Sequence, residues 1–244
     1  MCKLHKSIYG LKQSPRAWYA KLSSVLHSAG FKRSGADSSL FVRTGAGGKL
    51  VVLIYIDDLI ITGDNASEIF KLKQSLQQKF AIKDLGVLKY FLGIEMASSH
   101  KGLFLNQRKY VMDLLNDANM SESKPATTPL DCKLKLTMGG TPLSNISSYQ
   151  RLVGKLIYLT ITRPDISYAV SIVSQFMHSP SIDHLNLIKR ILRYLKGSVG
   201  RGILMTKNDH THIMGYCDAD WAGNAIDRKS TSGYCTFVGG NLVT

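Results

Sequence analysis

The sequence predicts an α+β protein, and three features of its apolar pattern predict this class. Apolar residues recur at helical spacing near residues 14–29 and again near 65–80, on either side of β-branched and aliphatic runs between residues 39 and 62. Three more helical patterns follow between residues 149 and 196, after which the pattern returns to strands. Helices and strands that occur in separate runs are typical of α+β proteins.

The first elements are a helix and three strands. Ser14 followed by Pro15 resembles an N-cap with proline at the first helical position, and an inward stripe of Trp18, Leu22, Val25, Leu26 and Ala29 ends at Gly30. Two strands, residues 39–43 and 49–56, are joined by the glycine-rich stretch 45–48, and a third strand, 59–62, follows Asp57 and Asp58. This pattern predicts a small antiparallel sheet with an acidic turn.

A second helix should cross this sheet. Asn65 with Glu68 three residues later is typical of a capping box, and the apolar stripe consists of Ile69, Leu72, Leu76 and Phe80. Extended segments are expected at residues 88–96 and 103–105. A helix at residues 107–118 should then turn Tyr110, Leu114 and Leu115 inward.

Residues 119–148 contain three prolines and many small polar residues, which indicates a loop or a domain boundary. Helices are expected at 149–160, 164–177 and 181–196, the last closed by Gly197. This last helix carries a basic stripe that faces either phosphates or water: Lys189, Arg190, Arg193 and Lys196. Strands are expected again at 212–217 and 233–238, with a further run starting at residue 241.

The charge of the chain favours a polyanionic partner. Its 244 residues contain 31 Lys plus Arg against 17 Asp plus Glu, a net charge of +14. Residues 1–56 contain Asp37 as their single acidic residue, beside Lys3, Lys6, Lys12, Arg16, Lys21, Lys32, Arg33, Arg43 and Lys49. Nucleic acid is the leading candidate, because basic side chains that bind phosphates release counterions. An anionic membrane is the second candidate. The alternative to both is a basic face that only contacts water.

The sequence excludes two classes. The longest apolar run, residues 50–56, is far shorter than the roughly 20 residues that cross a bilayer, and residues 1–10 contain no signal-peptide core, so a soluble, non-secreted protein is expected. The four cysteines have neither zinc-ligand nor disulfide-framework spacing and are expected to be reduced and mostly buried: Cys2, Cys132, Cys217 and Cys235.

Asp57 and Asp58 are the most informative pair of carboxylates. They directly follow an apolar strand, where adjacent carboxylates repel each other unless a cation neutralises them. Mg²⁺ prefers oxygen ligands, and two-metal phosphoryl transfer uses carboxylates that a rigid turn presents. Taken alone, however, an Asp-Asp pair in a hairpin is ordinary turn chemistry.

The surrounding motifs decide between these interpretations. Residues 53–64, LIYIDDLIITGD, resemble the Y-x-D-D catalytic hairpin of reverse transcriptases, and residues 6–19, KSIYGLKQSPRAWY, resemble the nucleotide-pocket motif of the Ty1/copia retrotransposon branch. The similarity continues through 80–95 (FAIKDLGVLKYFLGIE), 162–168 (TRPDISY), 216–223 (YCDADWAG) and 228–234 (RKSTSGY). It covers nearly the whole chain.

This resemblance implies a domain arrangement within the α+β class. Residues 1–118 would form a palm-like antiparallel sheet with helices, truncated fingers and the start of a thumb, and 119–148 a linker. Residues 149–207 would form a helical connection region and 208–244 an incomplete ribonuclease H-like sheet.

The resemblance also implies roles for individual residues. Asp57 and Asp58 would bind Mg²⁺ or Mn²⁺ in the polymerase site, and Tyr55 and Ile56 would lie in the same hairpin near the primer end. The other implied contacts are Gly10 and Gln13 with the incoming nucleotide, and Phe91, Leu92 and Gly93 with the primer strand. Asp218 would be the first metal-binding carboxylate of a ribonuclease H, whereas Asp220 is better explained as a structural residue.

Two parts of the family's pattern are missing. Reverse transcriptases of this branch use a third aspartate from an earlier strand, and Asp37 lies in no matching motif. The remaining ribonuclease H carboxylates would lie beyond Thr244. A polyprotein fragment that is inactive by itself is therefore expected.

Several alternatives and implied properties accompany this interpretation. The resemblance implies an RNA or DNA template-primer and deoxynucleotides as partners, and no membrane. It implies that the protein acts in a cytoplasmic particle or in the nucleus. The sequence leaves the oligomeric state open. One alternative is a nucleic-acid-binding remnant without turnover. Another is an unrelated nuclease that uses Asp57, Asp58 and Asp218 together, but no metal-nuclease spacing supports it.

Overall fold

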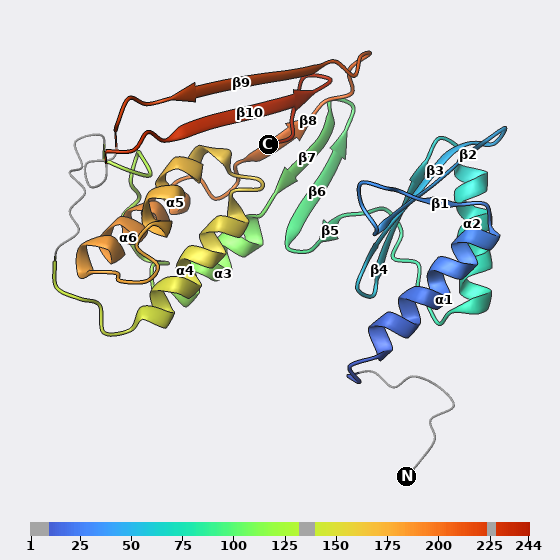
Figure 1. Ribbon diagram of the computed structural model, residues 1–244, viewed down its shortest axis with the longest axis horizontal. Helices are drawn as coiled ribbons and strands as arrows, with labels where there is room; N and C mark the ends of the chain where they lie inside the picture. Colours follow the sequence, from blue (N-terminus) through green and yellow to red (C-terminus); the bar gives the residue numbers. More distant parts are fainter. Residues whose placement is uncertain (1–9, 132–139, 224–227) are drawn as a thin grey trace, which may run out of the picture. The chain divides into compact units, whose positions relative to one another are not determined.

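The computed structural model describes residues 10–131, 140–223 and 228–244 and confirms the α+β class (Figure 1). The chain forms two compact units, Met1–Leu88 and Lys89–Thr244. In the described residues the first unit contains one antiparallel sheet and the second unit two, and each unit has its own cluster of buried apolar side chains. Each therefore has the separate core that distinguishes a structural domain.

The first unit is built on a four-stranded antiparallel sheet in the order β1-β2-β3-β4. Its strands are β1 (Lys32–Arg33), β2 (Leu40–Gly45), β3 (Gly48–Tyr55) and β4 (Asp58–Gly63). β2 and β3 meet at the pair Gly45–Gly48, and β3 and β4 meet at the pair Tyr55–Asp58. The predicted sheet, with Asp57 and Asp58 at a hairpin tip, is confirmed, whereas the two-residue β1 is too short to give a periodic signal.

Two helices pack against one face of this sheet, as predicted. α1 (Ser14–Ser28) and α2 (Ala66–Lys79) share a core with alternate residues of β3, so the other face of β3 points away from both helices. The buried residues of this core are Leu22, Val25, Leu26, Phe31, Phe41, Leu50, Val52, Ile54, Leu72 and Leu76.

The starts of both helices differ from the predicted caps. Gln13, not Ser14, is the N-cap of α1, and Pro15 lies one position later than expected; proline is tolerated there because the first N–H groups of a helix have no intrahelical partner. Asn65 caps α2 by accepting a hydrogen bond from the Ser67 N–H at 2.9 Å. Glu68 does not complete the capping box, because its carboxylate binds Arg43 and Lys71, each at 2.7 Å. Two cations attract a carboxylate more strongly than one neutral N–H does.

The second unit begins with a sheet that distant parts of the chain form together. β5 (Tyr90–Phe91), β6 (Ile94–Ser99) and β7 (Gly102–Asn106) are consecutive antiparallel strands, and β8 (Gly202–Met205) pairs with β7 from the far end of the helical region. β8 contains four residues and no alternation of polar and apolar side chains, so its pattern does not predict a strand.

Four helices supply the main core of this unit. They are α3 (Arg108–Asp117), α4 (Ile146–Leu159), α5 (Ser167–Ser174) and α6 (Ile182–Lys196). The expected single helix over residues 164–177 is wrong: a 3₁₀ turn, Pro164–Ile166, precedes α5, which ends at Ser174. Tyr149 lies fully buried among these helices and donates to the Val173 carbonyl at 2.6 Å, and burial raises the pKa of its hydroxyl to about 12.

The basic stripe of α6 holds a neighbouring segment of the chain. Arg193 Nε donates to the Lys124 carbonyl at 2.6 Å, Arg190 Nη2 donates to Thr128 Oγ1 at 3.0 Å, and Lys196 Nζ donates to the Ser121 carbonyl. The Ala126 N–H returns a hydrogen bond to the Arg193 carbonyl at 3.1 Å. Lys189 is exposed and these three side chains are partly exposed, so the stripe faces water in part, and contact with phosphates stays a prediction. The three side chains fasten residues 121–128 to α6.

A third antiparallel sheet ends the chain, in the order β11-β10-β9. It consists of β9 (Ile213–Ala219), β10 (Ser232–Val238) and β11 (Asn241–Leu242), and Figure 1 shows β9 and β10 as a long two-stranded ribbon. Asn241 joins the sheet to the segment after β8, because its side chain accepts from the Thr206 N–H at 2.6 Å and donates to the Thr206 carbonyl at 2.9 Å.

The ribbon leaves much of its apolar surface exposed. Ile213, Tyr216 and Tyr234 are 78%, 63% and 73% exposed. The prediction that the cysteines are mostly buried is wrong for these strands, because Cys217 is exposed and Cys235 is only half-buried. Cys2 and Cys132 lie outside the described residues. The cysteine prediction was wrong here because β9 and β10 are not covered by another layer of the described residues, so their side chains stay accessible.

Candidate catalytic hairpin and nucleic-acid interface

The β3–β4 hairpin presents four side chains of the predicted site together. The antiparallel pair Tyr55–Asp58 closes it, so Ile56 and Asp57 form a two-residue turn. Ile56 has φ of 51°, a left-handed conformation that is unusual for a β-branched residue. Tyr55 and Ile56 are 45% and 67% exposed, and both aspartates are exposed as well. A strained backbone at an exposed tip is typical of a functional turn rather than of packing.

The strand pairing fixes where these side chains point. Tyr55 and Asp58 are cross-strand neighbours and therefore share one face of the sheet. Ile54, on the opposite face, is buried in the core that α1 and α2 cover. Tyr55 and Asp58 thus lie on the face directed away from the helices, and Asp57 lies beside them in the turn.

Asp57 and Asp58 fit the requirements of a magnesium or manganese ion in part. Their carboxylates supply the hard oxygen ligands that these ions prefer. Within the described ranges, neither carboxylate forms a salt bridge, whereas Glu68 and Asp84 of the same unit are paired with lysine. Among the described residues, no group of three or more His, Cys, Asp or Glu side chains could hold a metal ion. The hairpin therefore presents two carboxylates that are unpaired among the described residues, fewer than the three side chains of a metal-binding group.

Gly10 and Gln13 lie at the start of α1. Gly10 has φ of 89°, and a Cβ at this position would meet no atom within 4 Å, so backbone conformation rather than space favours glycine. Gln13 is exposed and, as the N-cap of α1, makes no side-chain capping bond. The side-chain amide of Gln13 therefore does not cap the helix.

Phe91, Leu92 and Gly93 form the turn between β5 and β6 in the second unit. The pair Phe91–Ile94 closes a two-residue turn in which Leu92 and Gly93 both have positive φ, 51° and 83°. This combination matches the type I′ turn that suits the twist of two antiparallel strands. The extended segment predicted for residues 88–96 is thus a hairpin.

Helices of the second unit hold this hairpin, through residues that sequence reasoning missed. The Tyr158 hydroxyl on α4 donates to the Leu92 carbonyl, and Glu95 Oε1 accepts from the Lys109 N–H in the first turn of α3 at 2.7 Å. Tyr158 is far from the hairpin in sequence, and no motif or periodicity connects the two. Only the packing of α4 reveals the contact.

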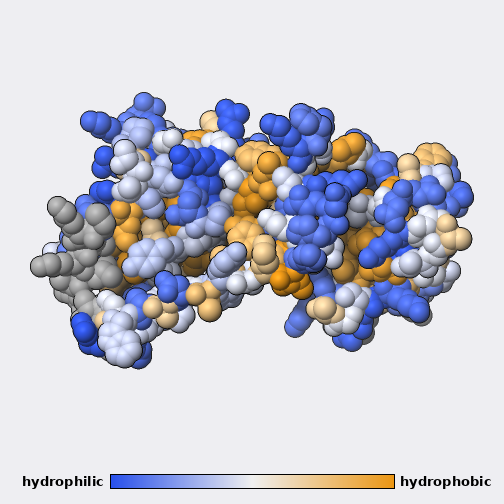
Figure 2. Space-filling view, turned by 90° about the horizontal axis from the view of Figure 1, so that it is seen from above, coloured by the Kyte–Doolittle hydropathy of each residue, from blue (hydrophilic) through white to orange (hydrophobic). Residues whose placement is uncertain are grey.

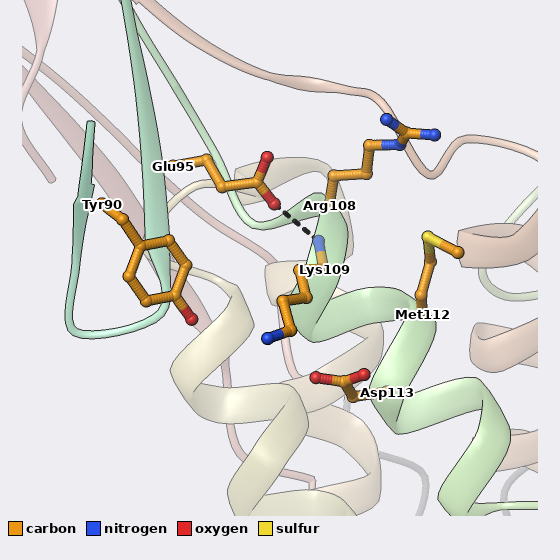
Figure 3. A pocket seen from close by; sticks show the side chains of 6 residues that line it. All are labelled: Tyr90, Glu95, Arg108, Lys109, Met112 and Asp113. Carbon is orange, nitrogen blue, oxygen red and sulfur yellow. Dashed lines mark hydrogen bonds between the residues drawn. The ribbon is translucent and has the colours of Figure 1, made fainter.

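An open hollow of about 450 Å³ lies between the hairpin strands and the start of α3 (Figure 3). Two carboxylates and two basic residues line it, with one aromatic ring and one thioether: Tyr90, Glu95, Arg108, Lys109, Met112 and Asp113. Figure 3 shows the Glu95 side chain directed from β6 to the backbone of α3. This bond fixes the distance between the hairpin and the helix.

Asp218 lies on β9 and is exposed, opposite Gly233 on β10. Asp220 has a structural role, because its Oδ1 accepts from the Gly223 N–H at 3.2 Å and from the Thr231 N–H at 2.8 Å. These bonds agree with the structural role expected of Asp220, whereas the metal-binding role of Asp218 stays a prediction. Asp57 and Asp58 belong to the first unit and Asp218 to the second.

The cationic side chains of α1 differ from those of α6. Lys12, just before the helix, and Arg16 and Lys21 on it are exposed and form no salt bridge or side-chain hydrogen bond within the part of the chain that the structure describes. Figure 2 shows hydrophilic side chains mixed with hydrophobic ones on the face it presents, not a continuous apolar surface. Of the helices in the described residues, none combines the length and apolar character needed to cross a membrane.

Comparison with known proteins follows the same motifs. The family model described as reverse transcriptase (RNA-dependent DNA polymerase) matches residues 1–132. The retrovirus-related Pol polyprotein from transposon RE1 of Arabidopsis thaliana is 46% identical over 240 residues, which is 98% of this chain and 16% of that polyprotein. The corresponding polyprotein from transposon TNT 1-94 of Nicotiana tabacum is 39% identical over 254 residues, covering 99% of this chain and 19% of its own length.

A shorter relative is matched over most of both chains. A putative transposon Ty5-1 protein of Saccharomyces cerevisiae is 31% identical over 245 residues, which is 99% of this chain and 80% of the relative. The chain thus spans about a sixth of the RE1 polyprotein but most of this yeast protein. No solved structure matches the chain.

Proposed function

The chain belongs to the reverse transcriptases of Ty1/copia-type retrotransposons, and from this premise we propose that its β3–β4 hairpin is part of an RNA-directed DNA polymerase site. The observation that carries the proposal is the hairpin itself. It exposes Asp57 and Asp58 beside Tyr55, on the face of the sheet that α1 and α2 do not cover.

Asp57 and Asp58 are proposed to hold Mg²⁺ or Mn²⁺. Bound there, the metal would supply charge stabilisation for phosphoryl transfer. The protein's own contribution is positioning. The Tyr55–Asp58 pair fixes the spacing of the strands, and the turn at Ile56 holds both carboxylates at the tip, so that their oxygens need little reorganisation.

The remaining predicted residues are proposed to bind substrates. Tyr55 would pack near the primer end, Gly10 and Gln13 would contact the incoming deoxynucleotide, and the β5–β6 turn at residues 91–93 would contact the primer strand. The exposure of Gln13 and of Tyr55 supports these roles, because both side chains are accessible to a substrate.

The polymerase site needs a third carboxylate. Two carboxylates are present at the hairpin, and β4 lies at an edge of its sheet, where a further strand can pair through its unused backbone groups. We propose that a segment preceding the polymerase motifs supplies this carboxylate in a longer polyprotein. A Mg²⁺-dependent primer-extension assay distinguishes this function from nucleic-acid binding without turnover.

The domain assignment made from sequence is retained as a proposal. The proposed palm and start of the thumb, residues 1–118, include the boundary between the two units at Leu88 and Lys89. Part of the proposed linker, 119–148, is fastened to α6. The helical connection region, 149–207, ends in β8, and residues 208–244 are proposed as the opening strands of a ribonuclease H domain that uses Asp218.

We expect the β9–β10 ribbon to be less stable than the hairpin of the first unit. Amides of residues 213–219 and 232–238 should exchange with solvent faster than those of residues 50–62, because β9 is exposed along its whole length. Hydrogen exchange of the 244-residue chain measures both segments together. Equal protection of the two would mean that the ribbon is packed far better than its exposure indicates.

Binding of a template-primer duplex is expected to weaken with salt and to show little sequence preference. Each phosphate contact contributes a slope of about −0.9 in a plot of log affinity against log salt concentration. Changing Lys12, Arg16 and Lys21 together to glutamine should therefore reduce the magnitude of the slope by about 2 to 3. A fluorescence-anisotropy titration at several salt concentrations gives this slope.

The matched control is the double change of Arg190 and Arg193 to glutamine. These side chains bind residues 124 and 128, so removing their charge should change the slope much less than the α1 substitutions do. A larger effect from α6 than from α1 would contradict the assignment of the interface.

A further inference from the structure

The Leu92 carbonyl at the tip of the β5–β6 hairpin has no hydrogen-bond donor within the hairpin itself. In a two-residue turn the flanking residues pair with each other, so the Leu92 carbonyl, at the first turn position, has no partner in the ladder. The Tyr158 hydroxyl on α4 donates to this carbonyl. A helix outside the sheet thus completes the hydrogen bonding of the turn.

Two aromatic rings pack against the same tip. A Cβ on Gly93 would lie 3.7 Å from the ring of Tyr158 and 3.8 Å from that of Tyr110. These two rings contact each other edge to face, with centroids 5.4 Å apart. The turn therefore rests on a defined surface, formed by one residue of α3 and one of α4.

The position of Tyr158 is fixed by contacts between these helices. The Tyr110 hydroxyl donates to the Lys155 carbonyl at 3.4 Å, and Lys155 forms an ion pair with Asp117 at 2.5 Å. Glu95 adds a second bond between the hairpin and α3 through the Lys109 N–H. Movement of the hairpin relative to the helices would break the Glu95 bond and the bond from Tyr158 to Leu92, so these two bonds hold the hairpin against α3 and α4.

We propose that Tyr158 is a positioning residue for the primer, whose hydroxyl sets where the turn at residues 91–93 meets the primer strand. The inference rests on the proposed contact between this turn and the primer, and it adds a residue of α4 that the polymerase motifs do not include. Tyr158 acts through the Leu92 carbonyl and does not touch the primer itself.

The test is photo-crosslinking of the 244-residue chain to a primer-template duplex with 4-thiothymidine at the primer 3′ end. Trypsin releases the hairpin as residues 90–101, whose crosslinked fraction mass spectrometry measures. Tyr158→Phe should lower that fraction about fivefold, the population change expected from loss of one hydrogen bond. Total duplex affinity should stay within about twofold, because phosphate contacts dominate it.

Tyr168→Phe is the matched control, because Tyr168 lies on α5, is 62% exposed, and makes no contact with the hairpin among the described residues. It should leave the crosslinked fraction unchanged, and amide exchange of α3 and α6 should confirm that both variants are folded. A wild-type fraction in Tyr158→Phe, or equal losses in both variants, would overturn the role of the Tyr158 hydroxyl while the primer contact stands. Absence of any crosslink in the wild-type chain would overturn the proposed primer contact and this inference with it.

Discussion

Replacing Arg163 by methionine is expected to lower the free energy of unfolding of the second unit by about 3 kcal/mol, the lower end of the cost of breaking a buried ion pair, because the Asp165 side chain is 34% exposed. Arg163 is 1% exposed and is the largest fully buried side chain in the described part of the chain. Methionine preserves much of its volume but leaves its partners without a donor. Urea denaturation followed by far-ultraviolet circular dichroism measures the change.

The size of this effect follows from the number of groups that Arg163 connects. Its guanidinium donates to both Asp165 oxygens, at 2.9 and 2.8 Å, and to the carbonyl and hydroxyl of Ser198, at 2.9 and 2.7 Å. Tyr194 donates to the same Asp165 carboxylate at 2.7 Å. Arg163 thus joins the 3₁₀ turn before α5 to the end of α6, and its loss removes the side-chain donor to Asp165 Oδ1 and to the buried Ser198 carbonyl.

Because the same network includes the carboxyl of Asp165, the stability of the second unit should depend on pH. Burial of the carboxyl acts to raise the pKa of Asp165, but hydrogen bonds from Arg163 and Tyr194 outweigh it and hold the pKa below its ordinary value. A lowered folded-state pKa contributes stability above the unfolded value of about 3.9, and this stability is lost as pH falls through the folded-state pKa. Wild-type stability should therefore drop in acid below about pH 4, and the Arg163 variant should lose less over that range.

Arg108→Met is the matched control, because Arg108 is exposed at the start of α3. It should change the free energy of unfolding by no more than about 0.5 kcal/mol. Adding Asp165→Asn to the Arg163 variant should restore part of the lost stability, since it removes the unpaired carboxylate. Equal effects of the Arg163 and Arg108 substitutions would show that the buried network contributes little.

Primer extension is expected to be absent from the 244-residue chain alone and to appear when an added segment supplies a third carboxylate. In that longer protein, Asp57→Asn should reduce the rate more than about 100-fold, because loss of residues that merely support a metal ligand already costs 10- to 100-fold. Extension of a labelled primer in the presence of Mg²⁺ measures both outcomes.

Asp37→Asn is the matched control for this experiment. Asp37 Oδ1 accepts from the Ser39 N–H at 2.8 Å and from its hydroxyl at 2.6 Å, and these bonds hold the pKa of Asp37 below its ordinary value. The carboxylate therefore serves a turn, and its replacement should not affect extension. Robust Mg²⁺-dependent synthesis by residues 1–244, lost on Asp57→Asn, would show that another group completes the site.

Local patterns in the sequence determined the first unit almost completely. The helical stripe through Leu22 and Leu26, the strand ending at Tyr55 and the turn at Asp57 each involve neighbours in the chain, so a short window contains the full signal. The motif around Asp57 also fixed which residues of the candidate site lie together. The Asn65 cap was predictable for the same reason, although the partner of Glu68 was not.

Tertiary structure decided the features that join distant segments. β8 becomes a strand because β7 offers it an edge, and the arginines of α6 form hydrogen bonds within the chain because residues 121–128 lie against them. Tyr158 reaches Leu92 across 66 positions of the chain. Hydrogen bonds of this kind depend on how whole helices and strands pack, and a pattern within one segment contains no information about its partner.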